Sequence, residues 1–301
     1  MTGFVSLSAI RRRFEKAFLA VNRPIWRRLP ARVRALHALQ AYGRWLHSMV
    51  SRNADRDMYL GTLFLRNRPA LELMRRLAAE KPPGSTMRIA VLGCSVGVEV
   101  YSILWTFRRA RPDLTVVVEA VDISPEVLAI AEEGAYGPEI SELVHESIFE
   151  RLTEAELREM FDCEGAGLRR VKPWLREGIT WRLGDAGDPG LVEELGPQDL
   201  VVANNFLCHM DAPSAERCLR NFAQLASPDG YLCVSGVDLN VRTKVALDLG
   251  WEPVPELMAE IHDGDPLVRA DWPWHWWGLE PLDRSRPDWP VRYASVFQIG
   301  R

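Results

Sequence analysis

Residues 91–102 read VLGCSVGVEVYS, and this stretch decides how the rest of the chain is interpreted. A short apolar run leads into a turn that holds Gly93 and Gly97, and the acid Glu99 follows. The apolar run predicts a buried strand, and the residues after the turn predict a helix. In open α/β sheets a ligand lies at such a turn, beyond the carboxyl end of the strand. The stretch therefore predicts a ligand site, with a plain tight turn as the alternative.

Strands and helices alternate from Arg88 onward, which is typical of a mostly parallel sheet with helices on both faces. We predict strands at 88–93, 115–122, 178–185, 199–205 and 229–236, and helices at 98–110, 125–134 and 214–226. The segment VRYASVFQIG (291–300) alternates in the manner of an edge strand or hairpin. The fold class is therefore α/β, with a Rossmann-like, doubly wound sheet.

Residues 1–52 are strongly basic. They hold ten arginines and Lys16 against the single acid Glu15, a net charge of +10, although the whole chain has a net charge of −4. Such asymmetry indicates contact with nucleic acid, a membrane or an acidic protein, or else a helical segment that packs on the acidic remainder of its own chain. We favour the second interpretation, because apolar residues are interleaved with the charges.

These apolar residues recur at helical spacing, and Pro24 and Pro30 interrupt the pattern. The pattern predicts two or three short amphipathic helices that end at the prolines. We predict a basic helical N-terminal segment over residues 1–80 and an α/β domain over residues 81–301. Helical and irregular sequence at about 138–178 breaks the alternation of strands and helices, and it is interpreted as an insertion.

The composition is that of a soluble globular protein, with 47% hydrophobic and 26% charged residues. No apolar run approaches the roughly 20 residues of a membrane-spanning helix, and the start lacks the order of a secretory signal. The five cysteines form no CxxC pair, which favours reduced thiols in a cytoplasmic protein. We expect no metal site, because no pair of candidate ligands has a recognised spacing. Those candidates are His209, Asp211, His262, Asp263 and His275.

Acids follow two further predicted strands, where their side chains reach the same edge of the sheet as the glycine turn. Asp122 ends the second strand and is placed to accept both hydroxyls of a ribose, and Ile123 beside it to lie against an adenine. Asp185 ends the third strand and suits the adenine amino group. Glu99 has the wrong charge for a pyrophosphate and the right charge for an ammonium group. Because the glycine spacing also departs from the dinucleotide pattern G-x-G-x-x-G, these residues point to S-adenosylmethionine and away from NAD.

The glycine turn resembles that of the chemotaxis-receptor methyltransferases (CheR type), whose consensus is close to AGCSTGEEPYS. The matching residues are Gly93, Cys94, Ser95, Gly97, Glu99, Tyr101 and Ser102. The resemblance covers roughly residues 55–240. It implies S-adenosylmethionine as the cofactor and a seven-stranded sheet whose last strands include an antiparallel edge. It also implies that the turn residues Gly93, Cys94, Ser95, Gly97 and Glu99 bind the cofactor.

Further segments match the family in order along the chain. TLFLRN (62–67) resembles its TxFFR motif, which implies that Thr62 and Arg66 reach the carboxylate of the cofactor. AVDISPEVLAIAEEGAYG (120–137) resembles its acid-bearing strand and the following helix. In the third strand, Asp185 and Ala186 stand where the family usually has Asn-Leu, and both are assigned to the cofactor site. Asn205 matches the asparagine of the family's fourth strand and is assigned there too.

The fourth strand departs from the family at two positions. The family reads close to CRNVLIYF, and its Arg and Tyr face the acceptor carboxylate and the transferred methyl group. This chain has Asn204 for that Arg and His209 for that Tyr. We assign a catalytic role to both, and a cofactor contact to Asn204 as well. His209 is predicted to orient or deprotonate the methyl acceptor, with a structural loop histidine as the alternative.

Four tryptophans crowd the stretch DWPWHWWGLE (271–280). They are interpreted as the anchor of a C-terminal hairpin on the sheet, and an acceptor pocket or a partner contact is the alternative. 

The sequence therefore predicts an S-adenosylmethionine-dependent methyltransferase and does not identify its acceptor. The candidates are a protein carboxylate, with an acidic protein as one option, and a small molecule. One alternative is glutamate methylation of a chemotaxis receptor. Another is a non-catalytic module that binds the cofactor and reports it to a partner. We expect neither a nucleic-acid partner nor a membrane span, and the oligomeric state stays open.

Overall fold

The computed structural model describes residues 7–54, 56, 60–137, 139–140, 147–165, 167–264, 272–277 and 279–300. The chain divides into two compact units. The first comprises Met1–Asp57 and Asp265–Asp283, and the second comprises Met58–Gly264 and Arg284–Arg301. Among the described residues, no helix is both long and apolar enough to cross a membrane.

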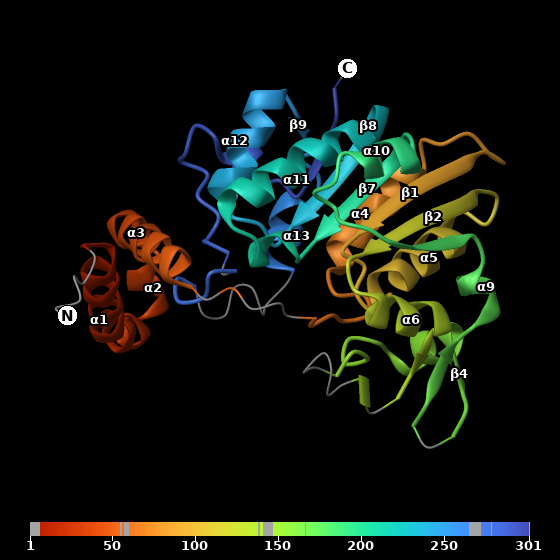
Figure 1. The fold of residues 1–301 in the computed structure, drawn as a ribbon, viewed down its shortest axis with the longest axis horizontal. Coiled ribbons are helices and arrows are strands. Elements are labelled where there is room, and N and C mark those ends of the chain that lie inside the picture. The colour runs from red at the N-terminus through yellow and green to blue at the C-terminus, as the bar shows by residue number, and fades with distance from the viewer. Residues whose placement is uncertain are drawn as a thin grey trace, which may run out of the picture. The chain divides into compact units, whose positions relative to one another are not determined.

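The first unit contains three N-terminal helices and the tryptophan-rich segment. Helices α1 (Leu7–Arg28) and α3 (His37–Asn53) pack against each other, and the short helix α2 (Ala31–Arg34) lies between them in sequence (Figure 1). The core of this unit is aromatic and aliphatic, and it consists of Trp26, Leu46, Met49, Trp272 and Trp274.

Two expectations for these regions are wrong. Pro24 lies inside α1 and does not end the helix. Its ring removes one backbone hydrogen bond, and burial of Trp26 two residues later offsets that loss. Trp272 belongs to this unit and not to the sheet, since its ring lies 5.8 Å from the Trp26 ring in an edge-to-face arrangement. The predicted break at Pro30 is confirmed, because this residue precedes the first residue of α2.

A seven-stranded sheet forms the centre of the second unit, in the order β6-β2-β1-β7-β8-β10-β9 (Figure 1). The parallel strands are β6 (Ile179–Leu183), β2 (Thr115–Asp122), β1 (Thr86–Leu92), β7 (Gln198–Asn204) and β8 (Ala226–Ser235). Beyond them, β10 (Val296–Gln298) runs antiparallel to β8 and pairs with the short edge strand β9 (Glu252–Pro253). The predicted Rossmann-like sheet with an antiparallel edge is confirmed.

The C-terminal segment 291–300 differs in detail from its prediction. Its first residues end the helix α15 (Trp289–Tyr293), and Val296–Gln298 alone form a strand. That strand lies inside the sheet, because β9 pairs with its outer side. 

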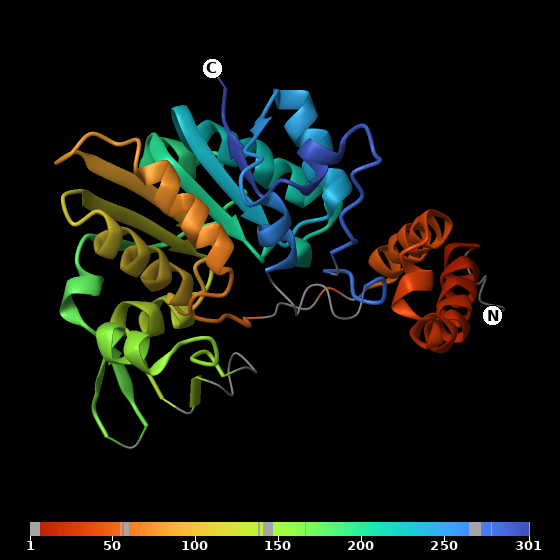
Figure 2. The ribbon, with the colours of Figure 1, turned by 180° about the vertical axis from the view of Figure 1, so that it is seen from behind.

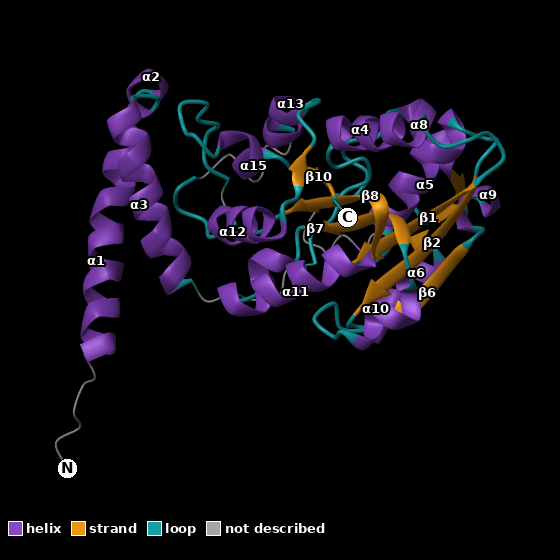
Figure 3. Cartoon of the chain, turned by 90° about the horizontal axis from the view of Figure 1, so that it is seen from above, coloured by secondary structure: helices purple, strands orange, loops and turns teal. Residues whose placement is uncertain are grey.

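Helices cover both faces of the sheet. α4 (Arg68–Ala78) and α5 (Val98–Ala110) lie on one face (Figure 2), and α10 (Gly190–Leu195), α11 (Ala212–Leu225) and α12 (Leu239–Leu249) lie on the other (Figure 1). Figure 3 shows the sheet between these two layers. Leu73 and Met74 of α4 are buried in the main core, so the second unit begins before residue 80, earlier than the predicted boundary.

The predicted insertion corresponds to a small antiparallel sheet between α6 (Pro125–Glu133) and β6. Its strands are β3 (Ala135–Tyr136), β5 (Arg169–Val171) and β4 (Phe161–Cys163), in that order. The connecting helix α8 (Glu154–Met160) and the short α9 (Pro173–Arg176) complete it. Phe64 packs edge-to-face on Phe161 at 5.0 Å, so the small sheet shares the main core.

Candidate functional site

The glycine turn joins β1 to α5 at the carboxyl edge of the sheet. Gly93, Ser95 and Gly97 have positive φ angles of 66°, 48° and 82°. A Cβ atom at position 97 would lie 2.9 Å from the Ala131 Cβ atom and 3.0 Å from the Trp181 ring. Position 97 therefore needs glycine both for its backbone conformation and for its packing. The turn leaves the first N–H groups of α5 facing the edge of the sheet.

Asp122 fixes this turn against the end of β2. Its Oδ2 atom accepts a hydrogen bond from the Ser95 N–H at 2.8 Å, and its Oδ1 atom accepts one from the Ser124 N–H at 3.1 Å. The side chain is 9% exposed, so this acid is more deeply buried than a free strand-end carboxylate. An ionised carboxylate offers about four lone-pair positions, which leaves capacity for ribose hydroxyls. Asp122 thus has a structural role beside its predicted role with the cofactor.

Glu99, Asn204 and Arg66 come from distant parts of the sequence and meet beside the turn. The Asn204 Nδ2 atom donates a hydrogen bond to the Glu99 Oε1 atom at 2.7 Å. Burial raises the pKa of Glu99, and the Asn204 hydrogen bond and the Arg66 charge partly counteract that rise. An ammonium group beside Glu99 would favour the ionised carboxylate in the same way as Arg66. Asn204 is therefore a positioning residue for Glu99, and its predicted contact with the acceptor stays a prediction.

The loop that carries Thr62 and Arg66 is tied to the turn and to α5. The Ser95 hydroxyl donates to the Leu60 carbonyl at 3.5 Å, and the Leu65 N–H donates to the Ser102 hydroxyl at 3.1 Å. The half-buried Thr62 lies between these two anchors in sequence. Folding therefore brings the segment that resembles TxFFR next to the glycine turn, where the resemblance implies that it acts.

The adenine side of the predicted site lies at the ends of β2 and β6. Asp122 pairs in register with Leu183, so the residues that follow each strand leave the sheet at one level. Ile123 is 61% exposed, as a residue that covers a ligand ring would be in the free protein. Asp185 Oδ1 accepts a hydrogen bond from the Gly187 N–H at 2.8 Å, and Ala186 is half-buried within that turn. Their contacts with adenine stay predictions.

The loop after β7 bends at Asn205, whose φ angle is 62°. Asparagine tolerates this left-handed conformation better than most residues. The Asn205 N–H donates to the Ser235 carbonyl at 3.1 Å, which fixes the bend against the end of β8. A Cβ atom at Gly236 would lie 2.5 Å from the Asn205 Cα atom, so β7 and β8 end in close contact. 

His209 follows in the short 3-10 helix η1 (Leu207–His209). Its N–H donates to the Phe206 carbonyl at 3.1 Å, and its side chain is half-buried. Two residues later, Asp211 begins α11 by accepting a hydrogen bond from the Ser214 N–H at 2.8 Å. The loop is thus fixed at both ends beyond the carboxyl end of β7. The role of His209 in methyl transfer stays a prediction.

Three residues that match the family's turn have structural side chains. Cys94 is 2% exposed, and burial raises the pKa of its thiol well above the usual value, so it is no nucleophile. The Tyr101 hydroxyl donates to the Ala131 carbonyl at 2.6 Å and ties α5 to α6. The Ser102 hydroxyl donates to the Val98 carbonyl at 2.7 Å. The cofactor contact of Cys94 stays a prediction, and burial of the side chain leaves the backbone to make it.

Sequence reasoning missed Phe206. A Cβ atom at Gly93 would lie 2.6 Å from the Phe206 Cδ1 atom, so the half-buried ring lies directly against the glycine turn. The ring also packs near Phe222, with 6.1 Å between centroids. A signal was available in the sequence, because β1 and β7 were both predicted and Phe206 follows the latter directly. The Phe206 ring therefore forms one wall of the glycine turn.

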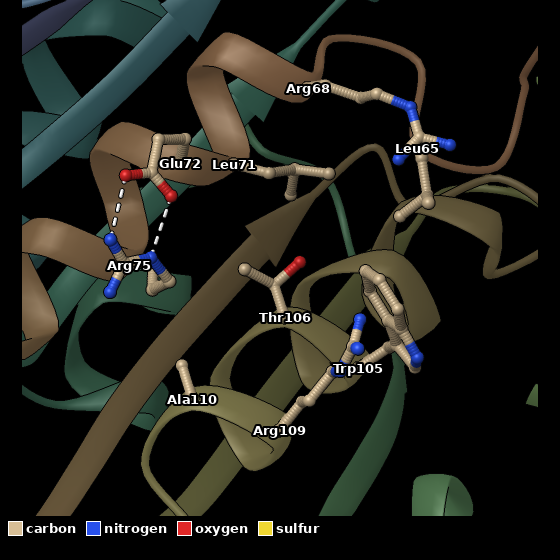
Figure 4. A pocket seen from close by; sticks show the side chains of 9 residues that line it. All are labelled: Leu65, Arg68, Leu71, Glu72, Arg75, Trp105, Thr106, Arg109 and Ala110. Atoms are coloured by element: carbon tan, nitrogen blue, oxygen red, sulfur yellow. Dashed lines mark hydrogen bonds and ion pairs between the residues drawn. The ribbon is translucent and has the colours of Figure 1, made fainter. Parts of the chain in front are cut away.

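A separate pocket of about 380 Å³ lies between α4 and α5 (Figure 4). Arg75 binds Glu72 through two hydrogen bonds of 2.7 Å, and the Arg109 guanidinium lies 5.1 Å from the Trp105 ring centroid. None of the residues assigned to the cofactor or the acceptor lines this pocket. Among the described residues, no three His, Cys, Asp or Glu side chains are grouped as a metal site requires.

The donor set at the carboxyl edge fits S-adenosylmethionine. The turn at Gly93 and Gly97 places the start of α5 at this edge, Glu99 offers a carboxylate to an ammonium group, and Arg66 offers a cation nearby. Two backbone N–H groups fix the Asp122 carboxylate at the end of β2, and its contact with a ribose stays a prediction. The fold and this site define an S-adenosylmethionine-dependent methyltransferase.

The comparison with protein families is more specific. Residues 61–244, more than half of the chain, match the family described as CheR methyltransferase, SAM binding domain. The chain therefore belongs to the CheR methyltransferase family, and S-adenosylmethionine is its cofactor. The family predicted from the glycine turn is confirmed.

Three relatives show how far the similarity extends. The chain is 29% identical over 188 residues to the probable biofilm formation methyltransferase WspC of Pseudomonas aeruginosa, covering 61% of this chain and 42% of the relative. It is 28% identical over 204 residues to WspC of Pseudomonas putida, covering 65% and 44%. It is 24% identical over 153 residues to chemotaxis protein methyltransferase 2 of Vibrio cholerae, covering 50% of each. The chain thus spans about half the length of the curated relatives it matches.

Proposed function

We propose that this chain transfers a methyl group from S-adenosylmethionine to a carboxylate of a protein. The observation that carries the proposal is the hydrogen bond between Asn204 and Glu99, because it links the cofactor turn to the strand end at which an acceptor would lie. The names of the relatives, which are chemotaxis and biofilm methyltransferases, support a protein acceptor. A small-molecule acceptor is the alternative. 

The bound cofactor supplies a methyl group activated by its sulfonium. In our proposal, Glu99 holds the ammonium group of the cofactor and Arg66 its carboxylate. Asp122 accepts hydrogen bonds from the ribose hydroxyls, and Asp185 accepts one from the adenine amino group. These contacts fix the direction in which the methyl group points, which is the positioning that an in-line transfer needs.

The acceptor side needs little acid–base chemistry if the acceptor is a carboxylate. A Glu side chain has a usual pKa of about 4.3, so it is ionised at neutral pH and needs no base. His209 then orients the acceptor, and Phe206 excludes water beside the turn. Glutamate methylation of a chemotaxis receptor is the narrower version of this proposal. The change of the family's Arg to Asn204 removes a bidentate partner for the acceptor carboxylate, so in our proposal a carboxylate acceptor is oriented by other groups, His209 among them.

The experiment is methyl transfer from labelled S-adenosylmethionine to cell lysate, followed by separation of proteins from small molecules. We expect label in protein, and its release as methanol in mild alkali, because carboxyl methyl esters hydrolyse under those conditions. Label in small molecules alone, or alkali-stable label in protein, would contradict a carboxylate of a protein. Cofactor binding without transfer to any fraction would favour the non-catalytic module.

We also infer a cytoplasmic location. All five cysteines are free thiols, which suits a reducing compartment.

A further inference from the structure

Helix α1 has three different faces. Phe18, Leu19 and Trp26 face the core of the first unit. Basic side chains, among them Arg13 and Lys16, are exposed on a second face. A third face is apolar and also exposed. Its residues and their exposed fractions are Ile10 at 52%, Phe14 at 78%, Val21 at 63% and Ile25 at 53%.

The four exposed apolar residues lie along one line. They are separated by steps of four, seven and four residues, which returns each side chain to the same side of an α-helix. At 1.5 Å per residue the line is about 22 Å long. Exposed apolar side chains are normal when scattered singly, and a continuous stripe of them marks an interaction surface. We call Ile10, Phe14, Val21 and Ile25 the apolar stripe of α1.

The surface around the apolar stripe is positively charged. Glu15 is the one acid among residues 1–52. Its Oε2 atom accepts a hydrogen bond from Asn53 at 2.6 Å, and its Oε1 atom pairs with Arg11 at 3.1 Å and Arg52 at 3.5 Å. The carboxylate is thus used within the first unit, and the sequence of α1 offers no second acid to a partner.

We propose that the apolar stripe of α1 binds the surface of an anionic lipid bilayer. A helix with an apolar face beside a Lys- and Arg-rich face lies in the plane of the membrane interface, with its apolar side chains among the acyl chains and its cations at the phosphates. Charge complementarity favours an anionic partner, because α1 has cations around the stripe and its single acid pairs within the first unit. The apolar stripe beside those cations favours a partner with an apolar interior beneath its anionic surface, as a lipid bilayer has.

The experiment is sedimentation of the full chain with vesicles of phosphatidylcholine alone or with one third phosphatidylserine. We expect binding to the anionic vesicles and little to the neutral ones, with the bound fraction falling as salt screens the cations. The double variant Phe14→Ser, Ile25→Ser removes the two ends of the stripe. It should bind the vesicles at least tenfold more weakly, because serine at 14 and 25 removes the favourable free energy of moving an apolar side chain from water into the bilayer.

Leu247→Ser is the matched control, since Leu247 is 60% exposed on α12 in the second unit. It should bind anionic vesicles like the parent, and unfolding curves should show that all variants fold. Equal vesicle binding by the double variant and the parent would overturn the proposal, as would no binding by the parent. If the parent is a dimer that binds no vesicles and the double variant is a monomer, the stripe binds a second copy of the chain and the lipid proposal is wrong. If the parent binds poly-glutamate and not vesicles, and the double variant binds neither, the stripe binds an acidic protein and the lipid proposal is again wrong.

Discussion

The carboxyl edge of the sheet has two halves that are built differently. In the cofactor half, at β1 and β2, backbone geometry forms the site, through the positive φ angles of Gly93 and Gly97 and the N–H groups that bind Asp122. In the half beyond β7, which we propose as the acceptor half, the side chains of Asn204 and His209 stand where the resemblance places the family's Arg and Tyr. Backbone requirements restrict a position to one or two residue types, whereas a side-chain contact changes with a single substitution. We therefore expect single substitutions to alter acceptor choice more readily than cofactor choice.

The largest expected effect comes from Gly97→Ala, which attacks the backbone half. An L-residue in the left-handed region costs about 1–2 kcal/mol, and crowding against Ala131 and Trp181 adds about 1–3 kcal/mol. We expect the free energy of unfolding to fall by about 2–5 kcal/mol in urea titrations. Gly250→Ala is the control, because Gly250 has a similar φ of 65° with nothing within 4 Å of its added Cβ atom. Equal losses in the two variants would show that packing at 97 is unimportant.

Asp122→Ala should affect both stability and cofactor binding. We expect S-adenosylhomocysteine to bind about 1.5–3 kcal/mol more weakly in calorimetry, the range for hydrogen bonds to charged groups. Stability should fall as well, because the Ser95 and Ser124 N–H groups lose their acceptor. Asp238→Ala is the matched control, since Asp238 also accepts two backbone N–H groups, from Asn240 and Val241 at the start of α12. The Asp238→Ala variant should lose stability and keep its cofactor affinity. An Asp122→Ala variant that also keeps its cofactor affinity would move the ribose site away from Asp122.

His209→Ala tests the side-chain half. We expect a single-turnover methyl-transfer rate at least tenfold lower, with cofactor affinity within about 0.5 kcal/mol of the parent, because the residue lies on the acceptor side. His209→Tyr restores the family's residue and should keep more activity than alanine if the side chain only positions the acceptor. His37→Ala, on α3 of the first unit, controls for loss of an imidazole. If His209→Ala lowers rate and affinity together, or neither, His209 is a structural loop residue.

The smallest effect is a pH dependence of cofactor affinity set by Glu99. Burial raises the pKa of Glu99 above 4.5 in the free protein, and a bound ammonium group lowers it again. Affinity should therefore be constant above the free-state pKa and fall by up to about tenfold per pH unit below it. The Glu99→Gln variant should bind more weakly and lose this slope. A parent and variant with the same pH profile would remove Glu99 from the ammonium site. 

Glu99 also affects the stability of the cofactor-free protein. Since its folded pKa is raised, the unfolding free energy should fall as pH rises from 4.5 through that pKa, because ionisation is then disfavoured by burial. Denaturant titrations of the parent and of Glu99→Gln over this range measure the difference directly.

The sequence predicted the central sheet closely because its signals are local. The predicted helix 98–110 and strand 115–122 coincide with α5, which follows Gly97, and with β2, which ends at Asp122. Helix α12 was not predicted, and its buried residues include Arg242 at 2% exposure, so its polar residues do not mark the solvent side. Periodicity fails where a charged side chain is buried.

The remaining errors arise from long-range packing. The partner of Trp272 is Trp26, almost the whole chain away, and no local pattern contains that contact. At the site, the type of each residue predicted Glu99 and Asp122 as ligands, and it did not predict that Asn204 would donate to Glu99 or that Asp122 would hold the turn. Those contacts depend on how strands distant in sequence align in the sheet.

The central claim is that the glycine turn and its neighbours bind S-adenosylmethionine. The most direct test is isothermal titration of the parent protein with S-adenosylmethionine, S-adenosylhomocysteine and NAD, with the melting temperature measured for each. The account predicts binding and a raised melting temperature with both sulfur compounds, because a ligand that binds only the native state stabilises it, and no response to NAD. Binding of NAD without a response to either sulfur compound would contradict it.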